Sequence, residues 1–413
     1  MALRAVLFGL EGVLIKEGST GLPRAVATEL GQLFSYLNGK GIRPIILSNR
    51  DWKQTNAKTG AIRSIDEVLE KRYPPHSLYV TSRMGLPRKP CKEAVTAILK
   101  KHGLSNAEVL YVGTSDIDFK TAVNSRLLFL NAIWDRQDVR YGFIVSSPSE
   151  IGRFIDAFGL KSHPWFYQVD SPIRYRSLSP FSTLREDYKE YSEAARQAAK
   201  AGTPERHFFL NSLVGSLYFS GMTEEFDYIT CYPGHGAGYG NPAMNDVLAV
   251  LGDCLRKRFL PDLIVRHHTA PQSRLLRIRK KKPDPLSQLN TIVLNQKPQK
   301  HTGEPYKRPL NLDGKGVLVV DDFCTAGYSL EAARLFLEEA GAKTVLLSWL
   351  KTINTDYEVI KLKNSFNPYS PQEFNPGDLK FKKLPYHNHI VDNVAPEEIK
   401  KTFERYKKWS FTN

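Results

Sequence analysis

Cysteine is scarce in this chain: its 413 residues contain only four, and no two of them form a Cys-x-x-Cys pair. This spacing excludes a disulfide framework and a zinc knuckle, and it fits a reducing compartment. Long hydrophobic runs are also missing, so no segment resembles a membrane span. The apolar start of the chain is interrupted by Glu11, which argues against a signal peptide. We therefore expect a cytoplasmic protein without a membrane partner.

Acidic residues are in deficit. The 43 Asp and Glu residues are outnumbered by 58 Lys and Arg residues, which gives a formal net charge of +15. This charge predicts attraction to polyanions such as nucleic acid or pyrophosphate-bearing metabolites, but it does not choose among them. With 41% hydrophobic and 24% charged residues, the composition is otherwise that of a globular protein.

The length exceeds what a single hydrophobic core supports, and short apolar runs alternate with amphipathic stretches in two parts of the chain. This alternation predicts an α/β protein of two domains, each a mostly parallel sheet flanked by helices. The expected parts are a first domain at 1–160, a linker with a helical connection at 161–206, a second domain at 207–350 and a C-terminal extension at 351–413. Strands are predicted at 4–8, 43–47, 77–81, 108–112 and 127–133, then at 226–231, 263–266, 291–294, 316–320 and 344–349.

Residues 316–329 form the most informative motif, Gly-Val-Leu-Val-Val-Asp-Asp-Phe-Cys-Thr-Ala-Gly-Tyr-Ser. The apolar run followed by Asp321 and Asp322 predicts a strand that brings two carboxylates to the carboxyl edge of a sheet, where ligands of open α/β folds bind. The next loop supplies backbone N–H groups and hydroxyls at the start of a helix, an arrangement that cradles phosphate. Together these groups fit a ribose 5-phosphate whose hydroxyls donate to the two acids.

This motif resembles the phosphoribosyl pyrophosphate signature of type I phosphoribosyltransferases, and the second domain resembles the ComF-like members of that family. The resemblance implies that Asp321 and Asp322 hold the ribose as catalytic residues, and that Mg²⁺ is carried on the pyrophosphate, with no protein ligand assigned to the metal. The implied 5-phosphate loop consists of Phe323, Cys324, Thr325, Ala326, Gly327, Tyr328 and Ser329. Cys324 is interpreted as a small filler within this loop, with a nucleophilic thiol as the alternative.

A second loop follows the strand predicted at 226–231 and is rich in glycine. By the same resemblance it binds pyrophosphate through its backbone N–H groups, and its residues are Tyr232, Pro233, Gly234, His235 and Gly236.

Residues 266–282 are densely basic, and three interpretations stay open for them. They form a solvated surface, a nucleic-acid-binding patch, or the mobile active-site loop of a ComF-like enzyme. In the last case Arg277 and Arg279 are catalytic, because their charges would neutralise the departing pyrophosphate.

The first domain resembles haloacid dehalogenase-like (HAD) hydrolases, in which a first strand delivers the sequence Asp-x-Asp-Gly. Residues 6–14 read Val-Leu-Phe-Gly-Leu-Glu-Gly-Val-Leu, so a glycine stands where the nucleophile belongs. The positions that match the family's motifs are Gly9, Glu11, Ser48, Lys89, Thr114 and Asp118. Because glycine can neither attack phosphorus nor hold a metal, we expect no phosphatase activity. A scaffold, regulatory or phosphate-sensing role is favoured over hydrolysis.

The expected function is therefore Mg²⁺-dependent phosphoribosyl transfer in nucleotide metabolism, with phosphoribosyl pyrophosphate and a nitrogenous, nucleobase-like acceptor as substrates. Two alternatives remain: a sensor of phosphoribosyl pyrophosphate or a nucleotide without turnover, and a nucleic-acid-associated protein with a basic surface. The oligomeric state is left open.

Overall fold

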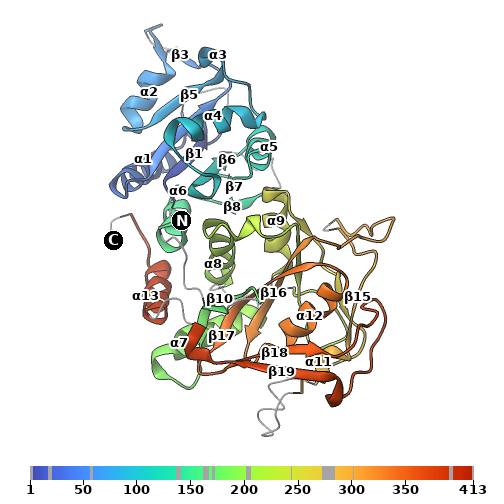
Figure 1. The fold of residues 1–413 in the computed structure, drawn as a ribbon. Helices are drawn as coiled ribbons and strands as arrows, with labels where there is room; N and C mark the ends of the chain where they lie inside the picture. The colour runs from blue at the N-terminus through green and yellow to red at the C-terminus, as the bar shows by residue number, and fades with distance from the viewer. Residues whose placement is uncertain are drawn as a thin grey trace.

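The computed structural model describes residues 3–16, 21–55, 59–135, 141–160, 167–169, 173–200, 206–242, 244–271, 284–300, 302–389 and 394–411. These residues form two α/β domains, which lie one above the other in Figure 1. Among the helices in these ranges, none has both the length and the apolar character needed to cross a membrane. The predicted architecture of two domains with mostly parallel sheets is confirmed.

The first domain is built on a six-stranded sheet in the order β5-β2-β1-β6-β7-β8, with every neighbouring pair parallel. The central strands are buried along their whole length, which explains why they are continuous apolar runs. All strands predicted for this domain are present within one residue of the expected bounds, and β8 is additional. The strands are β1 (Ala5–Gly9), β2 (Arg43–Ser48), β5 (Ser77–Val80), β6 (Val109–Gly113), β7 (Leu128–Ala132) and β8 (Phe143–Val145).

Three helices of the first domain, α2, α5 and α6, begin at serine residues that cap them. Ser64, Ser115 and Ser147 each accept a hydrogen bond from a backbone N–H in the first turn of the following helix. The helices are α1 (Arg24–Gly39), α2 (Ile65–Arg72), α3 (Thr81–Met84), α4 (Lys92–His102), α5 (Asp116–Asn124) and α6 (Pro148–Phe154). A short turn η1 (Asn106–Glu108), a π-helical turn η2 (Ile155–Gly159) and the hairpin of β3 (Lys53–Thr55) and β4 (Ile62–Ser64) complete the domain.

A second six-stranded sheet, in the order β13-β11-β16-β17-β10-β9, forms the core of the second domain. Only β9 runs antiparallel to its neighbour. The strands are β9 (Tyr167–Val169), β10 (Tyr175–Phe181), β11 (Tyr228–Cys231), β13 (Arg258–Phe259), β16 (Gly316–Cys324) and β17 (Lys343–Thr352). The central strands β16 and β17 are mostly buried, and β16 carries the informative motif.

The expected linker at 161–206 is corrected by β10, which lies inside it and pairs with β17 in the second sheet. Its sequence, Tyr-Arg-Ser-Leu-Ser-Pro-Phe, has too many polar groups to show the apolar pattern of a buried strand. Inside the sheet these groups find partners. The Tyr191 hydroxyl donates to Ser179 Oγ at 2.5 Å, and the hydroxyls of Tyr175 and Ser348 lie 2.9 Å apart.

Helices and two small antiparallel sheets surround the second sheet. The helices are α7 (Glu186–Lys200), α8 (Arg206–Phe219), α9 (Asn245–Leu255), α11 (Leu286–Leu289), α12 (Tyr328–Glu339) and α13 (Ala395–Lys407), with short turns η3 (Met222–Glu224), η4 (Pro376–Asp378) and η5 (Tyr386–His389). One small sheet contains β12 (Gly238–Tyr239), β14 (Ile264–Arg266) and β15 (Ile292–Leu294); the other contains β18 (Tyr357–Leu362) and β19 (Leu379–Leu384). The strands predicted at 263–266 and 291–294 are thus present, but outside the main sheet.

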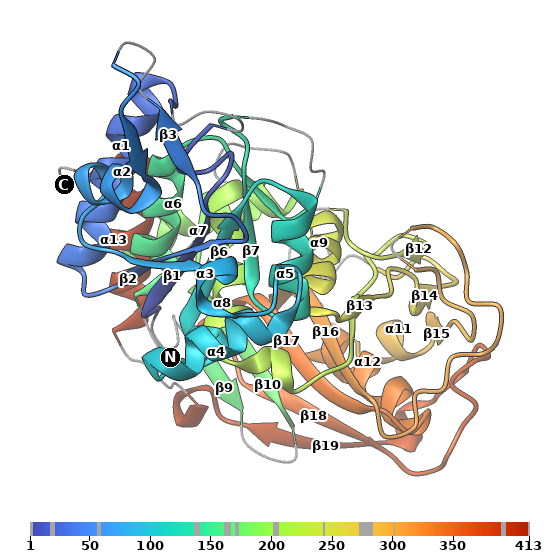
Figure 2. The ribbon, with the colours of Figure 1, turned by 90° about the horizontal axis from the view of Figure 1, so that it is seen from above.

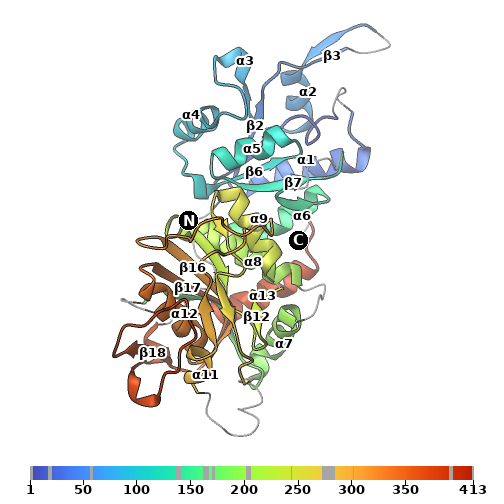
Figure 3. The same cartoon turned by 90° about the vertical axis from the view of Figure 1, so that its right-hand side faces the viewer.

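The two domains share one hydrophobic core, and α8 and α9 lie between their sheets (Figure 3). Gly215 of α8 allows a close approach to η2, because a Cβ atom added there would lie 2.8 Å from the Cβ of Phe158. In Figure 2, α13 lies on the same side of the molecule as α1 and α6 of the first domain. It packs against α7 and β10 of the second domain and against η2 of the first. These contacts tie the sheet that carries the candidate site to the first domain.

Candidate active site

The two acids of the motif lie on β16, at the carboxyl end of the second sheet. This strand extends to Cys324, four residues beyond the predicted end, so both acids are still part of it. Asp321 is 8% exposed and pairs in register with Ser348 of β17. The Asp322 backbone N–H donates to Asp321 Oδ1 at 2.9 Å, and the Phe323 N–H donates to Asp322 Oδ1 at 2.8 Å. The backbone thus holds both carboxylates at the strand end.

The surroundings of Asp321 make its ionised form costly in the free protein. Burial raises the pKa of Asp321 well above its usual range, and the adjacent charge of Asp322 raises it further. The cavity is therefore prepared for groups that donate hydrogen bonds or carry positive charge.

The loop after β16 turns into α12 at Gly327, which precedes the first helical residue. Its φ is +91°, and a Cβ atom there would lie 2.3 Å from the ring of Tyr357, so both conformation and space require glycine. The first backbone N–H groups of α12 have no partner within the helix and face the loop, which favours an anion there. Burial raises the pKa of the Cys324 thiol, which supports its interpretation as a filler.

The glycine-rich loop after β11 is held by Arg266, whose side chain is 2% exposed. Arg266 Nε donates to the Gly234 carbonyl at 2.6 Å, and its Nη2 donates to the Tyr232 hydroxyl at 3.2 Å and to Gln288 Oε1 at 2.9 Å. The sequence places Arg266 at the start of the basic stretch. In the structure it lies on β14 and supports the loop that is predicted to bind pyrophosphate, instead of forming part of a solvated basic surface.

Both predicted loops line one cavity of about 530 Å³. Every residue from 321 to 329 and from 232 to 235 lines it, whereas Gly236 does not. Arg266 and Pro271 from the basic stretch also line it, as does Leu330, which directly follows the motif at 316–329. Sequence reasoning missed Asp284, Ser287, Gln288 and Glu358, because they follow no motif and come from distant segments. Glu358 Oε2 accepts a hydrogen bond from the Tyr328 hydroxyl at 2.5 Å. The catalytic candidates Arg277 and Arg279 lie outside the described residues.

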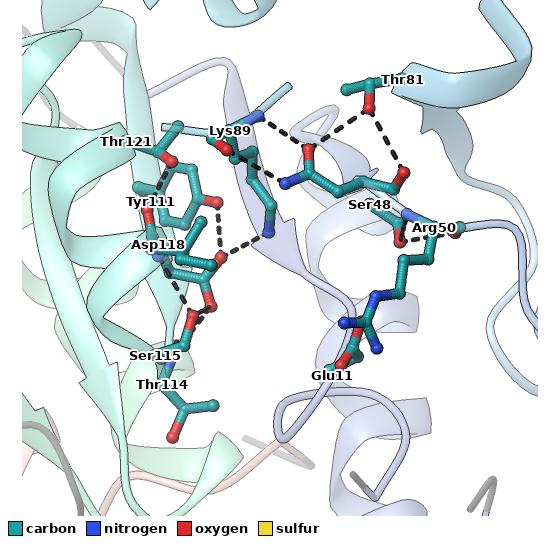
Figure 4. Close-up of polar contacts among 12 residues, drawn as sticks. Glu11, Ser48, Arg50, Thr81, Lys89, Tyr111, Thr114, Ser115, Asp118 and Thr121 are labelled. Atoms are coloured by element: carbon teal, nitrogen blue, oxygen red, sulfur yellow. Dashed lines mark hydrogen bonds and ion pairs between the residues drawn. The ribbon is translucent and has the colours of Figure 1, made fainter. Parts of the chain in front are cut away.

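Four of the six HAD-type positions line a second, smaller cavity of about 180 Å³ in the first domain (Figure 4), whereas Gly9 and Thr114 do not. Glu11, Ser48, Lys89 and Asp118 line it. Lys89 Nζ lies 2.6 Å from Asp118 Oδ1, which also accepts from the Tyr111 hydroxyl at 2.9 Å. Although burial works to raise the pKa of Asp118, the charge of Lys89 and these hydrogen bonds hold it below its usual range.

Asp118 occupies the space that a nucleophile on β1 would need. A Cβ atom added to Gly9 would lie 2.8 Å from Asp118 Oδ1. Glu11 Oε1 accepts a hydrogen bond from Trp52 Nε1 at 3.1 Å, and the Ser48 hydroxyl donates to the Arg50 carbonyl at 2.8 Å. The buried Thr114 hydroxyl finds no hydrogen-bond partner within the described part of the chain. The Glu11 and Ser48 side chains are therefore engaged in hydrogen bonds within the first domain.

Comparison with known proteins identifies the second domain. Residues 259–362 match the family described as the phosphoribosyl transferase domain, and this span contains β16, the phosphate loop, β17 and β18. The match confirms the resemblance drawn from the motif at 316–329. No curated protein matches the chain.

Several solved structures are similar to roughly a third of the chain. A provisionally assigned phosphoglycolate phosphatase from Lactobacillus delbrueckii subsp. bulgaricus is 22% identical over 31% of this chain, with a TM-score of 0.25. The chain spans about half, 52%, of that protein. The cobalt-bound deoxy-D-mannose-octulosonate 8-phosphate phosphatase of Haemophilus influenzae is 14% identical over 37% of this chain and 84% of its own, with a TM-score of 0.27. A HAD-superfamily hydrolase from Geobacter sulfurreducens is 14% identical over 36% and 98%, with a TM-score of 0.23.

Proposed function

We propose, from the phosphoribosyl transferase domain at residues 259–362, that this protein transfers a phosphoribosyl group from phosphoribosyl pyrophosphate to a nitrogenous, nucleobase-like acceptor. One observation carries the proposal: paired acids, a helix N-terminus with a tight loop, and a second backbone loop all line a single cavity. Each of these three features suits one part of the same ligand, namely ribose hydroxyls, a 5-phosphate and a pyrophosphate.

In the proposed complex, each part of the chain has a separate task. Asp321 and Asp322 accept hydrogen bonds from the ribose hydroxyls and so orient the sugar. The loop from Thr325 to Ser329 binds the 5-phosphate through backbone N–H groups and hydroxyls. The loop from Tyr232 to Gly236, held in place by Arg266, binds the pyrophosphate. Positive charge that develops at the anomeric carbon is stabilised by the nearby carboxylates.

Mg²⁺ is part of this proposal, and the residues present fit it. Within the described ranges, no group of three or more His, Cys, Asp and Glu side chains could hold a metal ion. An all-protein cage is not what Mg²⁺ requires, because it is commonly held by one or two carboxylates together with substrate phosphates. Asp321 and Asp322 would supply those carboxylates. When bound, Mg²⁺ would neutralise charge on the departing pyrophosphate.

The test measures turnover and binding separately. Purified protein is incubated with phosphoribosyl pyrophosphate, Mg²⁺ and a panel of nucleobases, and pyrophosphate release is followed. Calorimetry compares the wild type with the pair Asp321→Asn and Asp322→Asn, which we expect to bind at least roughly 100-fold more weakly, because charged hydrogen bonds to both ribose hydroxyls are lost. The matched control is Glu186→Gln with Asp187→Asn, an adjacent pair of acids exposed at the start of α7.

The outcomes separate the proposed enzyme from its alternatives. Turnover that depends on the acidic pair supports the transferase, whereas tight binding without turnover for any acceptor identifies a sensor. Unchanged affinity in the acidic double variant contradicts the whole assignment. For the first domain we propose a scaffold or phosphate-sensing role without hydrolysis, based on Gly9 and the closed Lys89–Asp118 pair.

A further inference from the structure

Lys351 is an ionisable side chain that the proposed mechanism does not use, and it lies directly behind the phosphate loop. It is located on β17 and is 0% exposed. Its Nζ donates to the carbonyl oxygen of Thr325, to the carbonyl oxygen of Thr355 at 2.6 Å and to Thr355 Oγ1 at 2.8 Å. Burial of an ammonium group is costly unless it is well hydrogen-bonded. The chain thus places a buried cation where one of its contacts is the loop itself.

Two threonines join Lys351 in tying the loop to the connection between β17 and β18. The Thr355 hydroxyl lies 2.6 Å from the Thr352 carbonyl oxygen and 3.1 Å from that of Thr325. The hydroxyls of Thr325 and Thr352 are 3.1 Å apart. Thr325 is therefore held from behind through both its backbone and its side chain.

The contacts of the loop carbonyls decide which way its N–H groups face. The Ala326 carbonyl accepts from the Glu358 N–H at 2.9 Å, and the Gly327 carbonyl accepts from the Glu331 N–H at 2.8 Å. The Thr325 carbonyl is instead taken by Lys351. In a trans peptide the C=O and the following N–H point in opposite directions. Because Lys351 does not line the cavity, its hold on the Thr325 carbonyl favours an Ala326 N–H that points away from Lys351 and toward the cavity.

Charge gives Lys351 a second effect. The described residues lining the cavity include the carboxylates of Asp284, Asp321, Asp322 and Glu358, whereas the guanidinium of Arg266 is engaged with the pyrophosphate loop. A phosphate group entering this cavity meets several acids. The buried ammonium group of Lys351, which contacts the Thr325 carbonyl of the loop, attracts the phosphate and so opposes that repulsion. This attraction is stronger than it would be in water, because charges interact more strongly in a buried environment.

We propose that Lys351 is a positioning residue of the phosphate loop, which holds the Thr325–Ala326 peptide with its N–H toward the cavity and favours a ribose-linked phosphate there by its buried charge. This inference rests on the proposed function, in which the loop binds the 5-phosphate. Lys351 itself does not line the cavity and is not assigned any contact with substrate.

The test uses ribose 5-phosphate and inorganic pyrophosphate as separate probes in calorimetry. We expect Lys351→Met to bind ribose 5-phosphate roughly tenfold more weakly, because a charged contact that orients the loop is lost, while the affinity for pyrophosphate changes little. Lys351→Arg, which keeps the charge, should recover part of the affinity. Lys343→Met, at an exposed position of the same strand, is the matched control.

A milder variant covers the case in which Lys351→Met does not fold. Thr355→Val keeps the ammonium and removes one of its acceptors, and it should weaken ribose 5-phosphate binding by a factor of about three. If Lys351→Met binds ribose 5-phosphate with wild-type affinity, the inference about Lys351 is wrong, but the proposed function stands. The same conclusion follows from Thr355→Val if only that variant folds. Equal losses for both probes also overturn the inference, since they indicate a general structural role. A wild-type protein that binds no ribose 5-phosphate overturns the proposed function together with the inference.

Discussion

Asp321 is a residue whose burial lowers the stability of the free protein while its carboxylate serves ligand binding. Burial and the charge of Asp322 raise its pKa in the folded protein above the unfolded value. Its contribution to stability is therefore most favourable below the unfolded pKa and is lost as the pH rises through the folded pKa. At neutral pH the free protein carries this cost, which ribose hydroxyls or a cation would relieve.

We accordingly expect Asp321→Asn to be more stable than the wild type near neutral pH, by an amount on the order of 1 kcal/mol, although it binds ligand more weakly. Asparagine does not titrate, so the difference should shrink toward about pH 4. Urea denaturation at several pH values measures it, with Asp187→Asn as the exposed control. A variant that is less stable than the wild type at neutral pH would show that Asp321 is not held at an electrostatic cost.

Gly9 provides the second prediction for a single residue. Gly9→Asp places the aspartate of the HAD motif back at its sequence position. We nevertheless expect no phosphatase activity and a lower stability than that of the wild type. The added Cβ would meet the Asp118 carboxylate at 2.8 Å and bring a second negative charge beside it. Overpacking of this kind costs about 1–3 kcal/mol. Thermal unfolding and a generic aryl phosphate assay measure both effects.

Gly9→Ala separates crowding from charge, because it adds the Cβ without the carboxylate. Aryl phosphate turnover by Gly9→Asp that disappears on adding Glu11→Gln would contradict the view that this pocket is closed to catalysis.

At the scale of elements, the connection from β16 to α12 depends on one left-handed residue. We expect Gly327→Ala to weaken ribose 5-phosphate binding roughly tenfold or more and to destabilise the fold by about 1–3 kcal/mol, since its Cβ would collide with the Tyr357 ring. Gly314→Ala is the matched control, because Gly314 also has a positive φ, +68°, but a Cβ there meets nothing within 4 Å. Calorimetry and urea denaturation compare the two. Equal effects of both substitutions would mean that the Tyr357 contact does not shape the loop.

At the scale of the whole molecule, the shared core predicts that the two domains unfold together. Alanine in place of glycine within a helix normally stabilises it by up to about 1 kcal/mol. For Gly215→Ala in α8 we expect the opposite sign, because the new Cβ would lie 2.8 Å from Phe158 Cβ across the domain interface. Gly39→Ala, at the end of α1 with open space around it, is the control. Differential scanning calorimetry that shows separate transitions already in the wild type would contradict this coupling.

The net charge of +15 gives a second whole-molecule prediction, which concerns partners. Changing Arg277 and Arg279 to Ala should strongly lower pyrophosphate release and leave weak nucleic-acid binding nearly intact, if these residues serve catalysis. If they serve nucleic acid, binding should weaken for all sequences, and its salt dependence should fall by about one unit of slope per lost phosphate contact. We expect the first result, because the stretch lies in the chain between the two ligand loops. If the double variant releases pyrophosphate and binds nucleic acid like the wild type, the stretch is a solvated basic surface.

The sequence alone determined those features that depend on neighbouring residues. The strand of β16, its two acids and the phosphate loop are contiguous, so a local pattern suffices to place them at the edge of a sheet. The apolar strands of the first sheet were predictable for the same reason, since strands buried on both faces are continuous apolar runs. The absence of a nucleophile also follows from one position, Gly9.

Only the tertiary structure decided which distant residues complete these sites. β10 escaped prediction because its polar groups become compatible with burial only when Tyr191 lies beside Ser179 and Ser348 lies beside Tyr175. For Arg266 a solvated basic surface remained one interpretation until β14 placed the residue against Gly234. Lys351 was assigned to the start of the C-terminal extension until β17, which extends beyond the predicted strand, brought it behind Thr325. A charged side chain is recognisable as buried only when its partners are known, and those partners lie up to 34 residues away from Arg266 and 26 from Lys351 along the chain. Sequence patterns report local periodicity, whereas burial of charge is a property of the assembled fold.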